Sequence, residues 1–279
     1  MTPIEARITS EVTVGDGHPL AVIAGPCVIE SYDGTVEIAG AISEICSSAG
    51  VPLIFKSSFD KANRTSVEAF RGIGMDKGLE TLNFVGTEMG IPTTTDVHEV
   101  GQVEEVAKVV DLIQVPALLS RQTDLLLAAA STGRCVNVKK GQFLSPADMR
   151  HVVDKVRAAG ATHLAVTERG TSFGYNDVIV DFRSLARLRN LGCPVILDAS
   201  HGAQQPGALG SRSGGDRDLI GVLARAGVAA GVDAIFVEVH AEPDRALSDG
   251  PTSLALQNLK PLLEDLLLVR EAWNSRQLD

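Results

Sequence analysis

The sequence predicts a single (β/α)8 barrel, and three observations support this fold. Eight short runs of apolar and β-branched residues recur along the chain, and each is followed by a stretch with helical spacing. Alternating strands and helices form a parallel sheet with right-handed crossovers. Eight such units within 279 residues match the length of one closed barrel.

The predicted strands begin about every 30 residues, the usual spacing of a βα unit. We place them at residues 21–26, 51–57, 91–96, 111–115, 134–139, 163–169, 193–199 and 233–239. The clearest predicted helices span residues 34–50, 121–133, 145–160 and 215–231. Ser145 is the expected N-cap of the third of these helices, with Pro146 in its first turn. A doubly wound open sheet is the alternative, but its GxGxxG fingerprint is missing after the first strand, which runs into GPCVIES.

The segment before the first strand has a pattern of its own. Residues 6–14, ARITSEVTV, alternate in polarity, which predicts a small β-hairpin that caps the N-terminal mouth of the barrel. We therefore expect residues 1–20 to form an N-terminal extension and residues 21–279 to form the catalytic barrel.

Composition argues against several classes of partner. The chain has 25 basic and 35 acidic residues, a net charge of −10, whereas nucleic-acid and anionic-membrane surfaces favour positive charge. No apolar run approaches the ~18 residues of a membrane span, and the N-terminus lacks a secretory signal pattern. Four cysteines in a chain of 279 residues are too few for a disulfide scaffold. We expect a reduced, cytoplasmic protein that binds neither nucleic acid nor membrane.

Polar residues gather at the ends of the predicted strands, where active sites of barrels lie. One group would come from neighbouring positions, because barrel closure places the eighth strand between the seventh and the first. Its members are Cys27, His201, Glu238 and Asp249. A thiolate, an imidazole and two carboxylates suit a divalent cation such as Zn²⁺, Fe²⁺ or Mn²⁺. The alternative is a buried cysteine, a hydrogen-bonded histidine and two solvated acids, and His240 is the main rival for the imidazole.

A second group is cationic and comes from the other side of the rim. It comprises Lys56, Lys61, Arg64, Lys139, Lys140 and Arg169, with Gln114 as a neutral donor. Strand periodicity predicts that Lys139 points inward and that Lys140 points outward or into the loop. Ordinary surface residues are the alternative, but Lys56 and Lys139 each end an apolar strand. Such clustering indicates several anionic groups, for example two phosphates and a carboxylate.

One long segment after the seventh strand is irregular. Residues 202–216 have the composition of a mobile lid. Within it, Ser211, Gly214 and Gly215 precede a predicted helix whose N-terminus could take a phosphate. A flexible loop without a ligand is the alternative.

The motifs at the strand ends resemble a known family. In chain order they are GPCVIES, FKSSFDKANRTS, TDVHE, IQVPALLSRQTDLL, NVKKGQF, TERGTSFGYN, DASHGAQ and FVEVH with LSDGP. Over roughly residues 20–265 they resemble the 3-deoxy-D-manno-octulosonate 8-phosphate synthases. The related 3-deoxy-D-arabino-heptulosonate 7-phosphate synthases carry a KPRTSP-like segment where this chain has KSSFDKANRT. The resemblance thus favours arabinose 5-phosphate over erythrose 4-phosphate as the aldehyde.

The resemblance also implies roles for individual residues. It implies one divalent metal per subunit held by Cys27, His201, Glu238 and Asp249, since Cys27 replaces the Asn of the metal-independent class. It implies contacts to phosphoenolpyruvate from Lys56, Ser58, Lys61, Lys139 and Arg169, and to arabinose 5-phosphate from Asn63, Arg64 and Thr65, where Ser is common.

The implied reaction is an aldol-like condensation in synthesis of the lipopolysaccharide core sugar. Lys61, Lys139 and Arg169 would stabilise the anionic enol ester. Asp249 or His201 would move a proton, and the metal would orient and polarise the aldehyde or a water. The family suggests a homotetramer in the cytoplasm. A synthase acting on erythrose 4-phosphate and a non-catalytic sugar-phosphate sensor are the alternatives.

Overall fold

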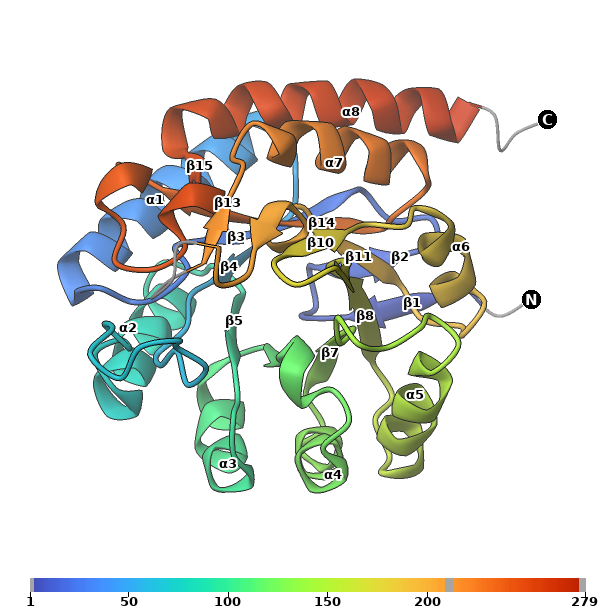
Figure 1. Cartoon of the computed structure of the whole chain (residues 1–279), viewed down its shortest axis with the longest axis horizontal. Coiled ribbons are helices and arrows are strands. Elements are labelled where there is room, and N and C mark those ends of the chain that lie inside the picture. The colour runs from blue at the N-terminus through green and yellow to red at the C-terminus, as the bar shows by residue number, and fades with distance from the viewer. Residues whose placement is uncertain (1–2, 209–212, 276–279) are drawn as a thin grey trace.

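The computed structural model describes residues 3–208 and 213–275 of the chain, and it confirms the predicted barrel. Eight parallel strands form a ring that is closed by pairing of β14 with both β3 and β11 (Figure 1). In ring order these are β3 Ala21–Gly25, β4 Leu53–Lys56, β5 Thr93–Asp96, β6 Leu112–Val115, β7 Cys135–Lys139, β8 Leu164–Glu168, β11 Val195–Asp198 and β14 Ala234–His240. Each lies within or one residue beyond a predicted run.

Helices surround these strands (Figure 1). They are α1 Tyr32–Ala49, α2 Met75–Thr87, α3 Val100–Val109, α4 Thr123–Ser131, α5 Met149–Ala158, α6 Arg183–Arg189, α7 Leu219–Ala229 and α8 Leu259–Ser275. Their buried faces pack with the outward-facing strand residues into one large apolar core. No helix in the described ranges is both long and apolar enough to cross a bilayer.

The predicted start of α5 is wrong. The α-helix begins at Met149, with Asp148 at the N-cap position, rather than just after Ser145. Residues before it form a tight turn in which Asp148 N bonds Ser145 O and Arg150 N bonds Ala147 O, each three residues apart. Ser145 still acts locally, since its Oγ accepts a 3.2 Å hydrogen bond from the Asp148 N–H.

The inside of the barrel has an apolar lower half. Strands β1 Glu5–Arg7 and β2 Thr13–Gly15 pair as an antiparallel hairpin below it. Four hairpin residues form one buried cluster with the inward residues at the starts of the barrel strands. The cluster comprises Ala6, Ile8, Val12, Val14, Ala21, Ile23, Ile54, Leu112, Cys135, Ala165, Ile196, Ala234 and Phe236. The hairpin therefore caps the N-terminal mouth with apolar side chains.

The upper half of the interior is polar because side chains alternate along each strand. Two residues beyond the apolar layer, the inward positions carry polar side chains on successive strands. These include Lys56, Asp96, Gln114, Asn137, Asp198 and Glu238. Lys139 is the next inward-facing residue of β7, two positions after Asn137. The fold therefore concentrates charge at one end of an otherwise apolar barrel.

Short elements decorate that same end. Strands β9 Thr171–Phe173 and β10 Asp177–Ile179 form a hairpin after β8. Within the segment expected to be a lid, β12 Gln204–Gln205 pairs with β13 Gly214–Gly215. Ser211 lies outside the described residues, and β15 Leu254–Ala255 pairs in parallel with the end of β14.

Candidate active site

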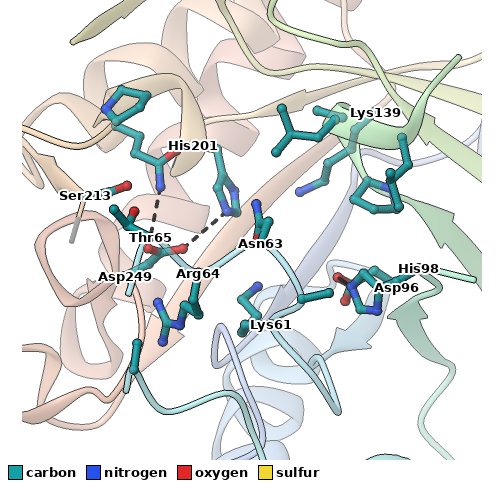
Figure 2. A pocket seen from close by; sticks show the side chains of 18 of the residues that line it. Lys61, Asn63, Arg64, Thr65, Asp96, His98, Lys139, His201, Ser213 and Asp249 are labelled. Carbon is teal, nitrogen blue, oxygen red and sulfur yellow. Dashed lines mark hydrogen bonds and ion pairs between the residues drawn. The ribbon is translucent and has the colours of Figure 1, made fainter. Parts of the chain in front are cut away.

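A cavity of about 760 Å³ opens at the carboxyl ends of the barrel strands (Figure 2). Most of the predicted substrate contacts line it, together with two of the predicted metal ligands. Those residues are Lys56, Lys61, Asn63, Arg64, Thr65, Gln114, Lys139, Arg169, His201 and Asp249. The fold thus gathers residues from seven segments of the chain around one space.

Two predicted cations, Lys139 and Arg169, lie at the ends of adjacent strands, the first as the last residue of β7 and the second directly after β8. The Lys139 Nζ lies 2.6 Å from Asp198 Oδ2 and 3.5 Å from the centre of the Phe236 ring. Burial lowers the pKa of Lys139, and the Asp198 carboxylate works against that change. The Arg169 Nη2 donates to Gln204 Oε1 at 2.9 Å, whereas its buried Nη1 has no hydrogen-bond partner among the described residues. A guanidinium edge is therefore available to an anion.

Ser58 lies just behind the cavity wall and belongs to a buried chain of hydrogen bonds. Its Oγ donates to Asp96 Oδ1 and accepts from the Lys61 Nζ at 3.3 Å. The His98 Nε2 lies 2.9 Å from Asp96 Oδ2, and both of these side chains line the cavity (Figure 2). Burial alone would raise the pKa of Asp96, but the His98 hydrogen bond and the Lys61 charge hold it well below its ordinary value.

The loop after β4 supplies the predicted aldose contacts. Asn63, Arg64 and Thr65 all border the cavity. The Arg64 Nε donates to Phe70 O at 2.9 Å and its Nη2 donates to Leu247 O at 2.8 Å. Arg64 therefore ties its own loop to the segment that leads into Asp249.

Lys56 lies between the two predicted groups. Its fully buried Nζ donates to Cys27 O at 2.8 Å and to Glu238 Oε1 at 3.3 Å. Strand β3 passes close beneath this point, since a Cβ on Gly25 would lie 2.0 Å from Lys56 O. Only glycine fits there, and this close approach places Cys27 beside Lys56.

The predicted direction of Lys140 is confirmed, but its place in the cationic group at the rim is wrong, because it is not among the residues that line the cavity. Its side chain does face away from Lys139, but it is fully buried. The Nζ lies 3.4 Å from Glu168 Oε1 beneath the covering loops. The outer face of the barrel is covered at this height, so a residue directed out of the barrel is still shielded from water.

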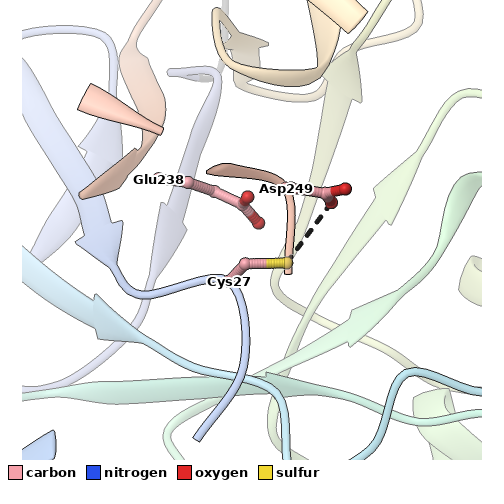
Figure 3. Close-up of side chains that lie close together, drawn as sticks. All are labelled: Cys27, Glu238 and Asp249. Atoms are coloured by element: carbon pink, nitrogen blue, oxygen red, sulfur yellow. Dashed lines mark hydrogen bonds between the residues drawn. The ribbon is translucent and has the colours of Figure 1, made fainter. Parts of the chain in front are cut away.

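Three of the four predicted metal ligands, Cys27, Glu238 and Asp249, converge at the seam between the last and first strands (Figure 3). One ligand atom each from Cys27, Glu238 and Asp249 lies within 4.8 Å of the others, and Cys27 Sγ is 3.3 Å from Asp249 Oδ2. The His201 Nε2 is 3.5 Å from Glu238 Oε1 and 3.7 Å from Asp249 Oδ2. His240 lies elsewhere, with its Nε2 3.5 Å from Glu30 Oε1.

Asp249 reaches this group through an unusual backbone. Its φ of 47° is the only positive value at a non-glycine residue in the described ranges. An aspartate in the left-handed region is uncommon and is typical of sites where a side chain must be aimed. The turn directs its carboxylate at both the thiol and the imidazole.

The chemistry of these side chains fits a divalent cation. Burial and the charges of Asp249 and Glu238 raise the pKa of the Cys27 thiol, and the opposing charges of Lys61 and Lys56 do not offset this, so the thiol stays protonated in the absence of a metal ion. The buried Glu238 Oε2 has no hydrogen-bond partner among the described residues. A thiol and two carboxylates confined together repel once charged, and a bound cation removes that repulsion and deprotonates the thiol. We conclude that the residues fit a metal.

Sequence reasoning missed Asp198 as a functional residue. Its fully buried carboxylate oxygen Oδ2 lies 2.7 Å from the ring Nδ1 of His201 and 2.6 Å from the Nζ of Lys139. Its other oxygen, Oδ1, accepts a hydrogen bond from the backbone N–H of His201 at 2.8 Å. Burial works against ionisation, yet the charges of His201 and Lys139 hold the pKa of Asp198 below its ordinary value. The available signal was strand periodicity, because Asp198 lies two residues after Ile196, which points into the barrel, and therefore points inward as well.

Ser248 was missed as well. Its buried Oγ lies 2.9 Å from Cys27 Sγ, directly before Asp249 in the chain. No pattern in the sequence points to it, since its place depends on how the loop after β14 folds back over β3.

Comparison with known proteins identifies the family of this chain. Residues 2–272 match the model of the DAHP synthetase I family. The chain belongs to this family. A relative in Synechococcus sp. is 55% identical over 271 residues, 97% of this chain and 95% of its own length, and is named 2-dehydro-3-deoxyphosphooctonate aldolase. Relatives of the same name in Cyanothece sp. and Syntrophotalea carbinolica are 53% and 52% identical, covering 96% and 93% of this chain and 98% and 94% of their own.

Proposed function

We propose that this chain condenses phosphoenolpyruvate with D-arabinose 5-phosphate and water. The products are 3-deoxy-D-manno-octulosonate 8-phosphate and inorganic phosphate. The single observation that supports this most is one cavity in which Lys139, Arg169 and the cations of the loop after β4 face the His201 imidazole and the Asp249 carboxylate. The Cys27 thiol and the Glu238 carboxylate lie beside that carboxylate, within 4.8 Å of it. The shared name of full-length relatives at 52–55% identity points to the same product.

Phosphoenolpyruvate carries a phosphate and a carboxylate, and we assign both to the cations on the barrel wall. Arg169 offers its uncommitted Nη1, and Lys139 is held rigidly by Asp198. Lys61 reaches the same space from the loop, and Gln114 adds an amide. Buried cations act strongly on a bound anion because little water screens them. Lys56 also lines the cavity while donating to Glu238 Oε1, and Ser58 supports Lys61 from behind the wall.

The phosphate of the aldose is assigned to the loop after β4. Arg64 supplies a guanidinium, and Asn63 and Thr65 supply an amide and a hydroxyl at the cavity edge. A sugar phosphate anchored there would extend its aldehyde toward Lys61, His201 and Asp249, which line the same cavity (Figure 2).

The proposed reaction forms one carbon–carbon bond and one carbon–oxygen bond to water, and it breaks the carbon–oxygen bond to phosphate as the new C2 hydroxyl loses its proton and becomes the carbonyl of the product. C3 of phosphoenolpyruvate attacks the aldehyde carbon, whose oxygen takes a proton. Water adds at C2 and loses a proton, and the resulting hemiketal phosphate releases inorganic phosphate by cleavage of the C2–O bond. Lys61, Lys139 and Arg169 stabilise the developing charge, a role suited to preorganised cations.

We assign the proton transfers to Asp249 and His201. Their Oδ2 and Nε2 atoms lie 3.7 Å apart at the cavity wall, and Asp249 Oδ1 is 3.5 Å from Gln204 Nε2. Asp198 is a counter-charge 2.7 Å from Nδ1 and accepts the backbone N–H of His201 at 2.8 Å, which holds the residue with Nε2 facing the two carboxylates. Such an orienting carboxylate is common behind catalytic and metal-binding histidines.

Cys27, His201, Glu238 and Asp249 would hold one divalent cation per subunit. When bound, such an ion supplies Lewis-acid polarisation of an oxygen beside it. The mixed sulfur, nitrogen and oxygen donors suit Zn²⁺, Fe²⁺ or Mn²⁺.

The proposed function is tested by measuring phosphate release with two aldoses side by side. Wild-type protein, phosphoenolpyruvate and a divalent metal are mixed with arabinose 5-phosphate, with erythrose 4-phosphate, or with no aldose. We expect release only with an aldose and at least about tenfold faster with arabinose 5-phosphate, a difference of about 1.4 kcal/mol in the barrier. Faster turnover of erythrose 4-phosphate would support the runner-up activity, and release in the absence of any aldose would reject a condensation.

We further propose that the chain acts in the cytoplasm as a homotetramer. All four cysteines are free, which suits a reducing compartment. Light scattering of the purified protein tests the assembly, and a monomeric mass at assay concentration would contradict it.

A further inference from the structure

A second buried ion pair lies directly behind the proposed anion site and takes no part in the mechanism above. Lys140 and Glu168 are both almost wholly inaccessible to water. Lys140 follows Lys139 at the end of β7, and Glu168 precedes Arg169 at the end of β8. The two residues thus neighbour the cations that we assign to phosphoenolpyruvate, but they face the other way.

The Lys140 ammonium is surrounded by oxygen atoms. Its Nζ lies 3.3 Å from each of the carbonyl oxygens of Gly141, Leu144 and Gly170, and 3.1 Å from Thr171 Oγ1. These atoms belong to the loop after β7 and to the start of the β9–β10 hairpin. Lys140 therefore joins the segments that follow two neighbouring strands.

The Glu168 carboxylate binds the backbone of the next two residues. Its Oε1 accepts the N–H of Arg169 at 3.1 Å and the N–H of Gly170 at 2.7 Å. Its Oε2 accepts the Ser184 hydroxyl of α6 at 2.7 Å. Both carboxylate oxygens of this buried acid therefore accept hydrogen bonds, and two of these three bonds fix the backbone at Arg169 and Gly170.

The two residues of the pair bind both backbone polar groups of Gly170. Glu168 binds its N–H, Lys140 binds its carbonyl oxygen, and its φ of +91° is a conformation that other residues avoid. This turn sets the direction in which the Arg169 side chain leaves β8. The guanidinium then enters the cavity, where Nη1 has no hydrogen-bond partner among the described residues.

Stability alone does not explain the pair. Desolvating two charges offsets most of their attraction, and apolar replacements of buried pairs are frequently neutral or stabilising. This pair instead fixes the backbone at Arg169 and Gly170, and so it can position the functional arginine. Such positioning matters because misplacing a binding group by ~1 Å can cost ~100-fold in rate.

We propose that Lys140 and Glu168 are positioning residues for Arg169. Their ion pair fixes the Arg169–Gly170 turn and so aims the guanidinium at the anionic substrate. This inference rests on the proposed function, in which Arg169 binds phosphoenolpyruvate.

The test is a double-mutant cycle in the complete, metal-loaded protein. Lys140→Met, Arg169→Ala and the combined variant are compared with wild type for the KM of each substrate and for kcat. We expect Lys140→Met to raise the KM for phosphoenolpyruvate about tenfold or more, the range seen when supporting residues behind a site are lost. The KM for arabinose 5-phosphate should change less than about twofold. In the Arg169→Ala background, Lys140→Met should add less than about twofold, because residues that act through one another are not additive.

A variant without an unpaired buried charge guards against loss of folding. Lys140→Met combined with Glu168→Gln removes both charges and keeps an oxygen that can accept the two N–H groups. It should fold and still raise the KM for phosphoenolpyruvate, because the Gly170 carbonyl loses its partner. Arg189→Met is the matched control, since Arg189 pairs with Asp233 at 2.7 Å outside the cavity and should affect melting but neither KM.

Three results would overturn the inference while leaving the proposed function intact. They are an unchanged KM for phosphoenolpyruvate in Lys140→Met, an equal effect in both Arg169 backgrounds, or a doubly neutral variant that does not fold. Absence of turnover by wild type with both substrates would instead reject the proposed function itself.

Discussion

Replacing Asp198 with asparagine tests how the two halves of the site are joined. The buried carboxylate lies 2.6 Å from Lys139 and 2.7 Å from His201. Asparagine keeps the shape and one acceptor oxygen but leaves the Lys139 ammonium without its counterion. Removing one partner of a buried pair costs about 3–5 kcal/mol. Each kcal/mol shifts the melting temperature of a chain near this size by about 2–4 °C, so Asp198→Asn should melt about 6–20 °C below wild type.

Thermal unfolding followed by circular dichroism measures this shift. Asp244→Asn is the matched control, because Asp244 is 90% exposed and pairs with Arg217 at 2.9 Å. Exposed pairs contribute about 0–1 kcal/mol, so the control should melt within about 4 °C of wild type. If Asp198→Asn melts no lower than that control, Asp198 does not hold Lys139 as the structure indicates.

The remaining predictions concern the N-terminal hairpin that caps the barrel, the stability of the protein at low pH, and the binding of arabinose 5-phosphate. Val14→Asp buries an unpaired charge in the cap and should lower the free energy of unfolding by several kcal/mol in urea titrations; a change below about 1 kcal/mol would contradict the cap. Because the folded-state pKa of Asp198 lies below its unfolded value, its stabilising contribution is complete above about pH 4 and is lost as pH falls further. Melting temperatures measured from pH 7 to pH 3 should therefore fall less steeply for Asp198→Asn than for wild type. Equal slopes would show that the ionised Asp198 carboxylate does not contribute to the stability. Arg64→Ala should raise the KM for arabinose 5-phosphate about tenfold or more and that for phosphoenolpyruvate less than about twofold in steady-state assays, and equal rises would assign Arg64 to both substrates.

The strands were predictable because burial on both faces leaves an uninterrupted apolar run. The inward direction of Lys139 followed from the same periodicity, since residues two apart along a strand share a face. Convergence of Cys27 with Glu238 required only that the barrel close between β14 and β3, because the two residues lie near the ends of neighbouring strands. These features depend on local pattern and topology, which the sequence contains.

Other features depend on contacts between distant loops. Parity gave the direction of Lys140, but its burial follows from the loop after β7 and the β9–β10 hairpin, which fold over it. The position of Ser248 beside Cys27 depends in the same way on a long loop after β14. The start of α5 was missed because a turn at Ser145 precedes the helix and uses the same kind of cap.

Metal dependence of turnover tests the assigned site most directly. Phosphate release from phosphoenolpyruvate and arabinose 5-phosphate is measured for wild type and Cys27→Ala before chelation, after chelation, and after divalent metal is restored, with bound metal quantified at each stage. We predict that chelated wild type stops and recovers with about one metal per subunit, whereas Cys27→Ala neither retains metal nor recovers. Full turnover by metal-free wild type would contradict the account.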